Sequence, residues 1–259
     1  SAAWAKDSVL AGRFSEKKLD KRTTFRLPWG QPDDLYYPAW MEGLWSVRAR
    51  LINYDAPLGL RYVSSGGSDM EMARQSLADQ QRRLGVPVDY RLRYFKTKRQ
   101  HIVEDRLFNL AAREDAYAGR SVTKSVKYSD SPGSTRENAM KRGDGPDDPL
   151  LAALLSSKLG VQKIIVTRFE AEEEGADIWR SSQAVRTLLA QGRLNPISVD
   201  EEIVTEYSRL SNGSVAGRVR LLGFLNPNDP LFFEAGGKAV TIADYDLELR
   251  PVSLVATNI

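Results

Sequence analysis

Strict alternation of apolar and polar residues over short segments is the feature that most constrains this chain. From Trp45 to Leu51 every second residue is apolar, and the residues between them are serine or arginine. Because successive side chains of a β-strand point to opposite faces, this period predicts a strand with one buried and one solvated face. The same period recurs at 90–95 and 244–250, so we expect a chain built mainly from antiparallel strands.

A hairpin signal joins two further predicted strands, 202–210 and 215–224. The link between them contains Asn212-Gly213, and Asn-Gly is the strongest short hairpin signal because both residues accept positive φ. Other strands are expected over 101–112, 122–128 and 161–169 and from residue 178, with helical segments over 70–84, 150–159 and 183–190. About eight strands and few, short helices favour an antiparallel β-barrel, because a closed barrel leaves no unpaired strand edge.

Residues 1–35 differ from the rest of the chain in composition. They are polar and basic and are broken by Pro28 and Pro32, which predicts an extended N-terminal arm with a short helical piece. Residues 36–259 are expected to form a single barrel domain, since barrels of this length are common. Within that domain, the Pro- and Gly-rich segment 129–149 predicts a long, mobile loop.

The residue types that most catalytic sites need are scarce. Cysteine is absent and histidine occurs once, as His101, which excludes disulfides, thiolate metal sites and histidine clusters within one chain. Spacing singles out no pair among the 34 acidic residues, so we predict neither a catalytic residue nor a metal site. The net charge is only +3 and the charges are interspersed, which argues against nucleic-acid binding. No apolar run approaches the roughly 18 residues of a membrane-spanning helix.

A structural plug is predicted at the start of the first strand. Gly43-Leu44-Trp45 has the Gly-x-Trp form that opens lipocalin-like barrels, in which glycine permits a sharp turn and tryptophan closes the barrel end. Arg250 ends the last predicted strand and is expected to lie over the Trp45 ring. Neither residue implies chemistry.

Aromatic residues gather just before that strand, at Trp29, Tyr36, Tyr37, Trp40 and Trp45. Two interpretations stand side by side. The aromatic side chains could be a core cluster over the barrel end, or the first four could form a docking surface, since Trp and Tyr are enriched at interface hot spots.

The arm is a second candidate for contact with a partner. Its basic residues are Arg13, Lys17, Lys18, Lys21, Arg22 and Arg26. They outnumber the acidic residues around them, and the arm has few apolar residues with which to fold alone. We therefore expect it to become ordered only against a partner or against its own barrel.

Two stretches together resemble a known family. The first contains Leu35-Tyr36-Tyr37-Pro38-Ala39-Trp40, Gly43-Leu44-Trp45 and Ala56-Pro57-Leu58-Gly59, and the second contains Tyr207, Leu225-Asn226-Pro227-Asn228-Asp229-Pro230-Leu231-Phe232-Phe233 and Tyr245-Asp246-Leu247-Glu248-Leu249. They are similar to the opening and closing segments of an uncharacterised, lipocalin-like family of cyanobacterial and chloroplast thylakoid proteins. The likeness covers about 33–60 and 178–250, with a divergent middle.

What the resemblance implies is a thylakoid-lumen protein, peripheral to the membrane and without an assigned reaction or a required cofactor. We expect first a non-catalytic protein that docks on the lumenal face of a photosystem or its assembly intermediate. The second hypothesis is a carrier that holds a pigment, carotenoid or lipid in the barrel, and the third is an enzyme acting on such a ligand. A cavity of about 300 Å³ or more would favour the carrier, whereas a filled barrel would favour docking.

Overall fold

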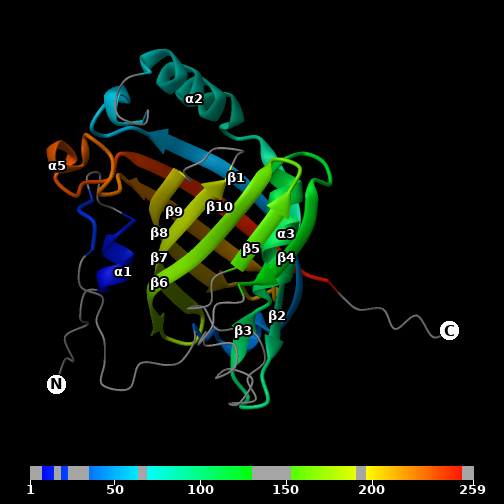
Figure 1. Cartoon of the computed structure of the whole chain (residues 1–259). Coiled ribbons are helices and arrows are strands. Elements are labelled where there is room, and N and C mark those ends of the chain that lie inside the picture. The colour runs from blue at the N-terminus through cyan, green and yellow to red at the C-terminus, as the bar shows by residue number, and fades with distance from the viewer. Residues whose placement is uncertain are drawn as a thin grey trace, which may run out of the picture.

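The computed structural model describes residues 8–14, 19–22, 35–63, 69–129, 153–190 and 197–252. The predicted loop from residue 130 onward and the predicted contact residues Lys17, Lys18, Arg26 and Trp29 lie outside these ranges. The predicted mainly β fold is confirmed within them: ten antiparallel strands form one sheet that curls into a half-barrel (Figure 1).

The strands run in the spatial order β3-β2-β1-β10-β9-β8-β7-β6-β5-β4. Their bounds are β1 (Gly43–Asp55), β2 (Pro87–Lys96), β3 (Ile102–Glu104), β4 (Thr123–Tyr128), β5 (Ala153–Ser157), β6 (Gly160–Glu174), β7 (Ile178–Ala190), β8 (Ile197–Arg209), β9 (Val215–Phe224) and β10 (Thr241–Pro251). Every described strand pairs with its sequence neighbours, except that β3 and β4 do not pair with each other. The first and last strands, β1 and β10, also pair, so the sheet is a meander whose two free edges are β3 and β4.

The described residues also form a few short helices. They are α1 (Val9–Gly12), α2 (Met70–Arg83), α3 (Arg106–Tyr117) and α5 (Phe232–Ala235), with 3₁₀ turns at Ala39–Met41 and Leu60–Tyr62. Within the described ranges, no helix combines the length and apolar character needed to cross a membrane.

Helix α3 closes the open side of the half-barrel. The end strands β3 and β4 do not pair with each other, and α3, which connects them in the chain, packs on β2, β4 and β5 (Figure 1). Asp105 caps its first turn by accepting a hydrogen bond from the backbone N–H of Phe108 at 3.1 Å. Asn109 fixes the helix to β2, because its side chain accepts from the Arg93 N–H at 2.7 Å and donates to the Arg93 carbonyl at 3.2 Å.

The predicted alternation sets the inner face of the sheet. In β1, Trp45, Val47 and Leu51 are buried on the inside while Arg48 points outward. The Asn-Gly hairpin is also confirmed: it joins β8 to β9, and Gly213 has a φ of 79°.

Gly217 of β9 is required by a close approach. A Cβ atom at this position would lie 3.1 Å from the ring of Tyr207, which crosses it from the neighbouring strand. The absent side chain therefore leaves room for one of the large inward-facing aromatic residues.

Three sequence predictions are wrong. The expected strand 101–112 is the short strand β3 followed by α3, and the expected helices 150–159 and 183–190 are β5 and the second half of β7. Both segments are rich in Leu and Ala, which are strong helix formers. Strand β5, however, pairs with β4 and β6, and strand β7 pairs with β6 and β8, and this pairing outweighs the local helix propensity.

A second, smaller core lies on the outer face of the sheet beneath the arm. Leu19 is fully buried there against Val204, Leu222 and Ile242 of three neighbouring strands. The arm backbone also joins the barrel, since the Ala239 N–H donates to the Leu19 carbonyl at 2.9 Å. The described part of the arm therefore forms part of the folded domain.

A polar-lined cavity inside the half-barrel

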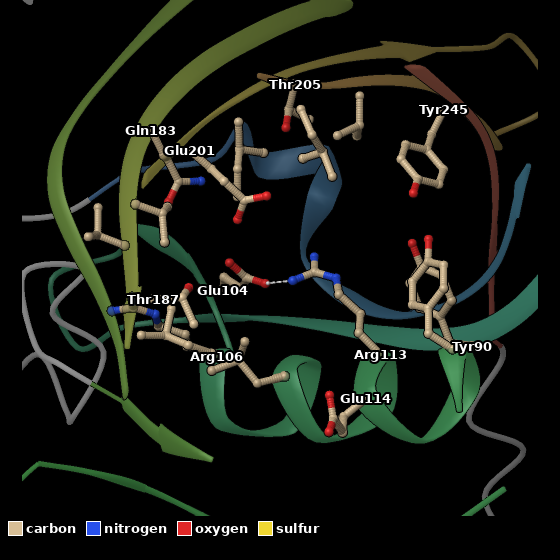
Figure 2. Close-up of a pocket in the computed structure, with 18 of the residues that line it drawn as sticks. Tyr90, Glu104, Arg106, Arg113, Glu114, Gln183, Thr187, Glu201, Thr205 and Tyr245 are labelled. Carbon is tan, nitrogen blue, oxygen red and sulfur yellow. Dashed lines mark ion pairs between the residues drawn. The ribbon is translucent and has the colours of Figure 1, made fainter. Parts of the chain in front are cut away.

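The curled sheet and α3 enclose a cavity of about 470 Å³ (Figure 2). Its apolar lining comes from inward positions of six strands and from α3: Leu110, Leu155, Ile164, Val166, Val185, Ile203, Val219, Leu221 and Leu247. The volume lies within the range of pockets that bind small molecules. The half-barrel is therefore not filled by its own side chains.

An ion pair stands inside the cavity. Arg113 of α3 extends into it, and its guanidinium lies 3.2 Å from the Glu104 carboxylate of β3 (Figure 2). The Arg113 side chain keeps 36% of its surface accessible, and this surface faces the cavity. Burial acts to lower the pKa of Arg113, but Glu104 and the surrounding tyrosines outweigh it and raise the pKa, so the group stays charged.

Glu104 is held in place by the residue that anchors α3. The Asn109 side-chain amide donates to the Glu104 carboxylate at 2.9 Å, and Asn109 is fully buried. The position of the ion pair is therefore set by backbone and amide contacts as well as by charge attraction.

Tyrosine is the most frequent residue type among the other polar groups that line the cavity. Tyr94 and Tyr207 meet with their hydroxyl oxygens 3.4 Å apart, and burial raises the pKa of Tyr207 to about 12. Burial likewise raises the pKa of Tyr90, Tyr117 and Tyr245. At neutral pH these phenols are uncharged and can donate hydrogen bonds into the cavity.

Glu201 is an acidic residue of the cavity without a partner among the described residues. It projects into the cavity from β8, where Val185 of β7 and Gly223 of β9 are its neighbours across the sheet (Figure 2). Within the described part of the chain it has no hydrogen bond or ion pair, and burial alone raises the pKa of its carboxyl. A carboxyl held in this way favours its protonated form or requires a donor from a ligand.

Two residues of the predicted aromatic cluster, Tyr37 and Trp45, belong to the main hydrophobic core. Trp45 is buried and donates its indole N–H to the Met41 carbonyl at 2.8 Å. Tyr37 lines the cavity and stacks on Trp179 with ring centroids 4.4 Å apart. Core packing is thus the role that the structure gives these residues.

The other two described residues of the aromatic cluster, Tyr36 and Trp40, are less buried. Trp40 donates to the Ala176 carbonyl at 3.1 Å, and Tyr36 stacks on His101 with centroids 4.0 Å apart. Both are half-buried against the protein's own chain.

The predicted contact of Arg250 with Trp45 is not formed. Gly43 does make the expected turn, with a φ of 128°. Arg250, however, pairs in register with Ser46, whose side chain faces outward, and its own side chain is 78% exposed. Residue 250 has the wrong strand parity for the interior, because adjacent strand positions face opposite sides.

The described cations of the arm are engaged by the barrel itself. Arg13 pairs with Glu202, Lys21 with Asp200 at 2.8 Å, and Arg22 with Glu170. Arg13 is buried. Of the two alternatives that the sequence left for the arm, order against a partner or against its own barrel, these three side chains follow the second.

The cavity residues themselves escaped sequence reasoning. Glu104 falls in the segment mistaken for one strand and Arg113 directly follows it, while Glu201 lies in the acidic run 200–202, a pattern typical of a solvated segment. The period of β8 was the available signal: Glu201, Ile203, Thr205 and Tyr207 share one face.

A half-barrel of antiparallel strands around a polar-lined cavity defines the molecule as a β-barrel-like protein with an internal pocket. Among the described residues, no group of three or more His, Asp or Glu side chains could hold a metal ion. The family model "Domain of unknown function (DUF6816)" matches residues 29–253, so the chain belongs to this family. No curated protein and no solved structure matches the chain.

Proposed function

We propose that this protein is a lipocalin-like carrier that binds a small lipophilic molecule inside its half-barrel. The observation that carries the proposal is the cavity of about 470 Å³, which exceeds the roughly 300 Å³ at which ligand pockets begin. Its walls combine apolar side chains from six strands with a set of hydroxyl, carboxyl, amide and guanidinium groups. That mixture suits a ligand with an apolar body and one polar end.

The cavity is a better basis for function than the arm. Docking on a photosynthetic complex was predicted from the resemblance, with the basic arm as a contact element, but Arg13, Lys21 and Arg22 pair with acidic residues of the barrel. The thylakoid-lumen location and the photosystem partner therefore remain predictions from the resemblance. A pigment, carotenoid fragment or lipid is the corresponding ligand class for that setting.

The test is binding of a fluorescent apolar probe, N-phenyl-1-naphthylamine, to the full chain. Val219→Trp on the inner face of β9 fills part of the cavity and is expected to reduce probe affinity about tenfold or more, since the probe then loses apolar contact. Ala216→Trp places the same side chain on the exposed face of β9 and serves as the matched control.

Circular dichroism and thermal unfolding verify that both variants fold. Equal probe affinity in the wild type and in a folded Val219→Trp variant would exclude the cavity as the binding site. Organic extraction of the protein purified from its native source, followed by mass spectrometry, then identifies what occupies the cavity. Turnover of the extracted molecule by the purified protein would favour the enzyme hypothesis instead.

A further inference from the structure

The charged groups that line the cavity do not balance. Three carboxyl side chains face it, from Glu104, Glu114 and Glu201, against two guanidinium groups, from Arg106 and Arg113. Glu104 is paired with Arg113 and also accepts from Asn109. Glu114 receives the Gln162 amide at 3.4 Å. The buried Oε1 of Glu114 has no hydrogen-bond partner among the described residues. Glu201 goes further: among the three carboxyl groups it is the one whose needs for a donor and a positive charge are met at neither oxygen by the described residues.

The surroundings of Glu201 define what could meet them. The neighbouring strand positions offer Val185 on β7 and Gly223 on β9, neither of which can donate a side-chain hydrogen bond. Tyr54 and Tyr245 are close enough for the Glu201 charge to raise their pKa, although burial is the larger cause for both. Gln183, Thr187 and Thr205 also line the cavity, but none of them forms a hydrogen bond with the Glu201 carboxyl.

We propose that the natural ligand carries a protonated amine, and that Glu201 is the residue that binds this amine at the polar end of the cavity. The inference rests on the proposed carrier function and names the ligand class for it. An ammonium group supplies the missing donor and the missing positive charge together. Tyrosine rings beside a carboxylate favour a cation further, because the ring face is electronegative. A carboxylate ligand would instead be repelled by Glu201.

Binding of an amine is coupled to the ionisation of Glu201. Burial raises the pKa of the free carboxyl, and a bound ammonium favours the ionised form. Amine affinity therefore rises with pH until Glu201 is ionised in the free protein, while the alkylamine itself stays protonated below pH about 10. Below that point each binding event releases the Glu201 proton to the buffer. The other charged groups near the site are Glu104, Arg113 and, towards Tyr245, Arg83.

The test compares three probes with the same chain, decylamine, decanol and decanoate, each displacing N-phenyl-1-naphthylamine from the full-length protein. We expect decylamine to bind about tenfold or more tightly than decanol, the effect of one charge-assisted contact. Glu201→Gln should abolish this preference and leave decanol affinity unchanged. Glu248→Gln, which removes an exposed carboxylate on the outer face of β10, should change none of the three.

Calorimetry in buffers with different ionisation enthalpies should detect proton release on decylamine binding to the wild type and none in Glu201→Gln. An amine preference that survives in a folded Glu201→Gln variant, or decanoate as the tightest probe, would overturn the assignment. If decanol and decylamine bind equally, only the ligand class fails. If neither the fluorescent probe nor any of the three compounds binds, the carrier function itself fails.

Discussion

Three adjacent acidic residues of β8 have different electrostatic environments, because Asp200 and Glu202 lie on the outer face of the sheet and Glu201 lies on the inner face. On the outer face, Asp200 accepts from Lys21 and Arg186 at 2.8 and 2.7 Å, and Glu202 pairs with Arg13 and accepts from Ser182 at 2.7 Å. Between them, Glu201 faces inward and has no partner in the described chain.

The carboxyl groups on the two faces of β8 contribute differently to stability. Nearly buried carboxylates that are matched by cations hold the arm and the barrel together. An enclosed carboxyl left unmatched costs stability, and residues that cost stability cluster where a ligand binds. Under the proposed function, the outer face of β8 stabilises the fold and the inner face binds the ligand, and substitutions on the two faces test this assignment.

The largest loss of stability is expected at Trp45, in the main hydrophobic core. Trp45→Ala removes a buried aromatic side chain and should lower the free energy of unfolding by about 3–5 kcal/mol. Urea denaturation measures the change. Ile52→Ala on the outer, exposed side of the same strand is the control and should alter stability by less than about 0.5 kcal/mol. A similar loss in both variants would contradict the assignment of inner and outer faces.

The outer face should be next in sensitivity. Arg13→Ala leaves the buried Glu202 carboxylate without its cation and should cost about 3 kcal/mol, the lower end of the range for breaking a buried ion pair. Arg186→Ala removes a half-exposed partner of Asp200 and should cost about 1 kcal/mol or less. Chemical denaturation of both variants ranks them, and an Arg13→Ala protein as stable as the wild type would show that the arm is only a tail.

Asp200 should give the outer face its pH dependence. Burial acts to raise the pKa of this carboxyl, but hydrogen bonds from Arg186 and Lys21 outweigh it and lower the pKa below 3.8. The contribution to stability is therefore present above the unfolded-state pKa and is lost as the pH falls through the lowered folded-state pKa. Asp200→Asn should cost about 1–2 kcal/mol at neutral pH. Thermal unfolding from pH 7 to pH 3 checks that this cost shrinks on acidification.

Glu201 should show the opposite sign with the smallest effect. Burial raises its folded-state pKa above the ordinary value of an exposed glutamate, so the folded state binds the proton more tightly than the unfolded state does. Stability is greatest below the unfolded-state pKa and declines as the pH rises through the folded-state pKa. Glu201→Gln should therefore raise the melting temperature slightly at pH 7, with the gain vanishing near pH 4. A lower melting temperature at pH 7 would mean that the carboxylate has a stabilising partner.

The sequence by itself determined the strands with clear period-2 alternation and the hairpin through Asn212-Gly213. Both are local properties: alternation follows from the geometry of one strand, and an Asn-Gly turn needs no distant contact. For the same reason the sequence placed Trp45 inside, and careful counting of strand parity would have placed Arg250 outside.

Only the tertiary structure decided the rest. Whether 183–190 is helix or strand depended on the pairing of β7 with both neighbours, and that competition is not visible in the segment itself. Helix α3 became a wall of the cavity because the sheet left an open side between β3 and β4. The arm cations found acidic partners about 150 to 190 residues away along the chain. Glu201 differs from Asp200 and Glu202 only in the groups that folding brings within reach, because burial and pairing are properties of the assembled barrel.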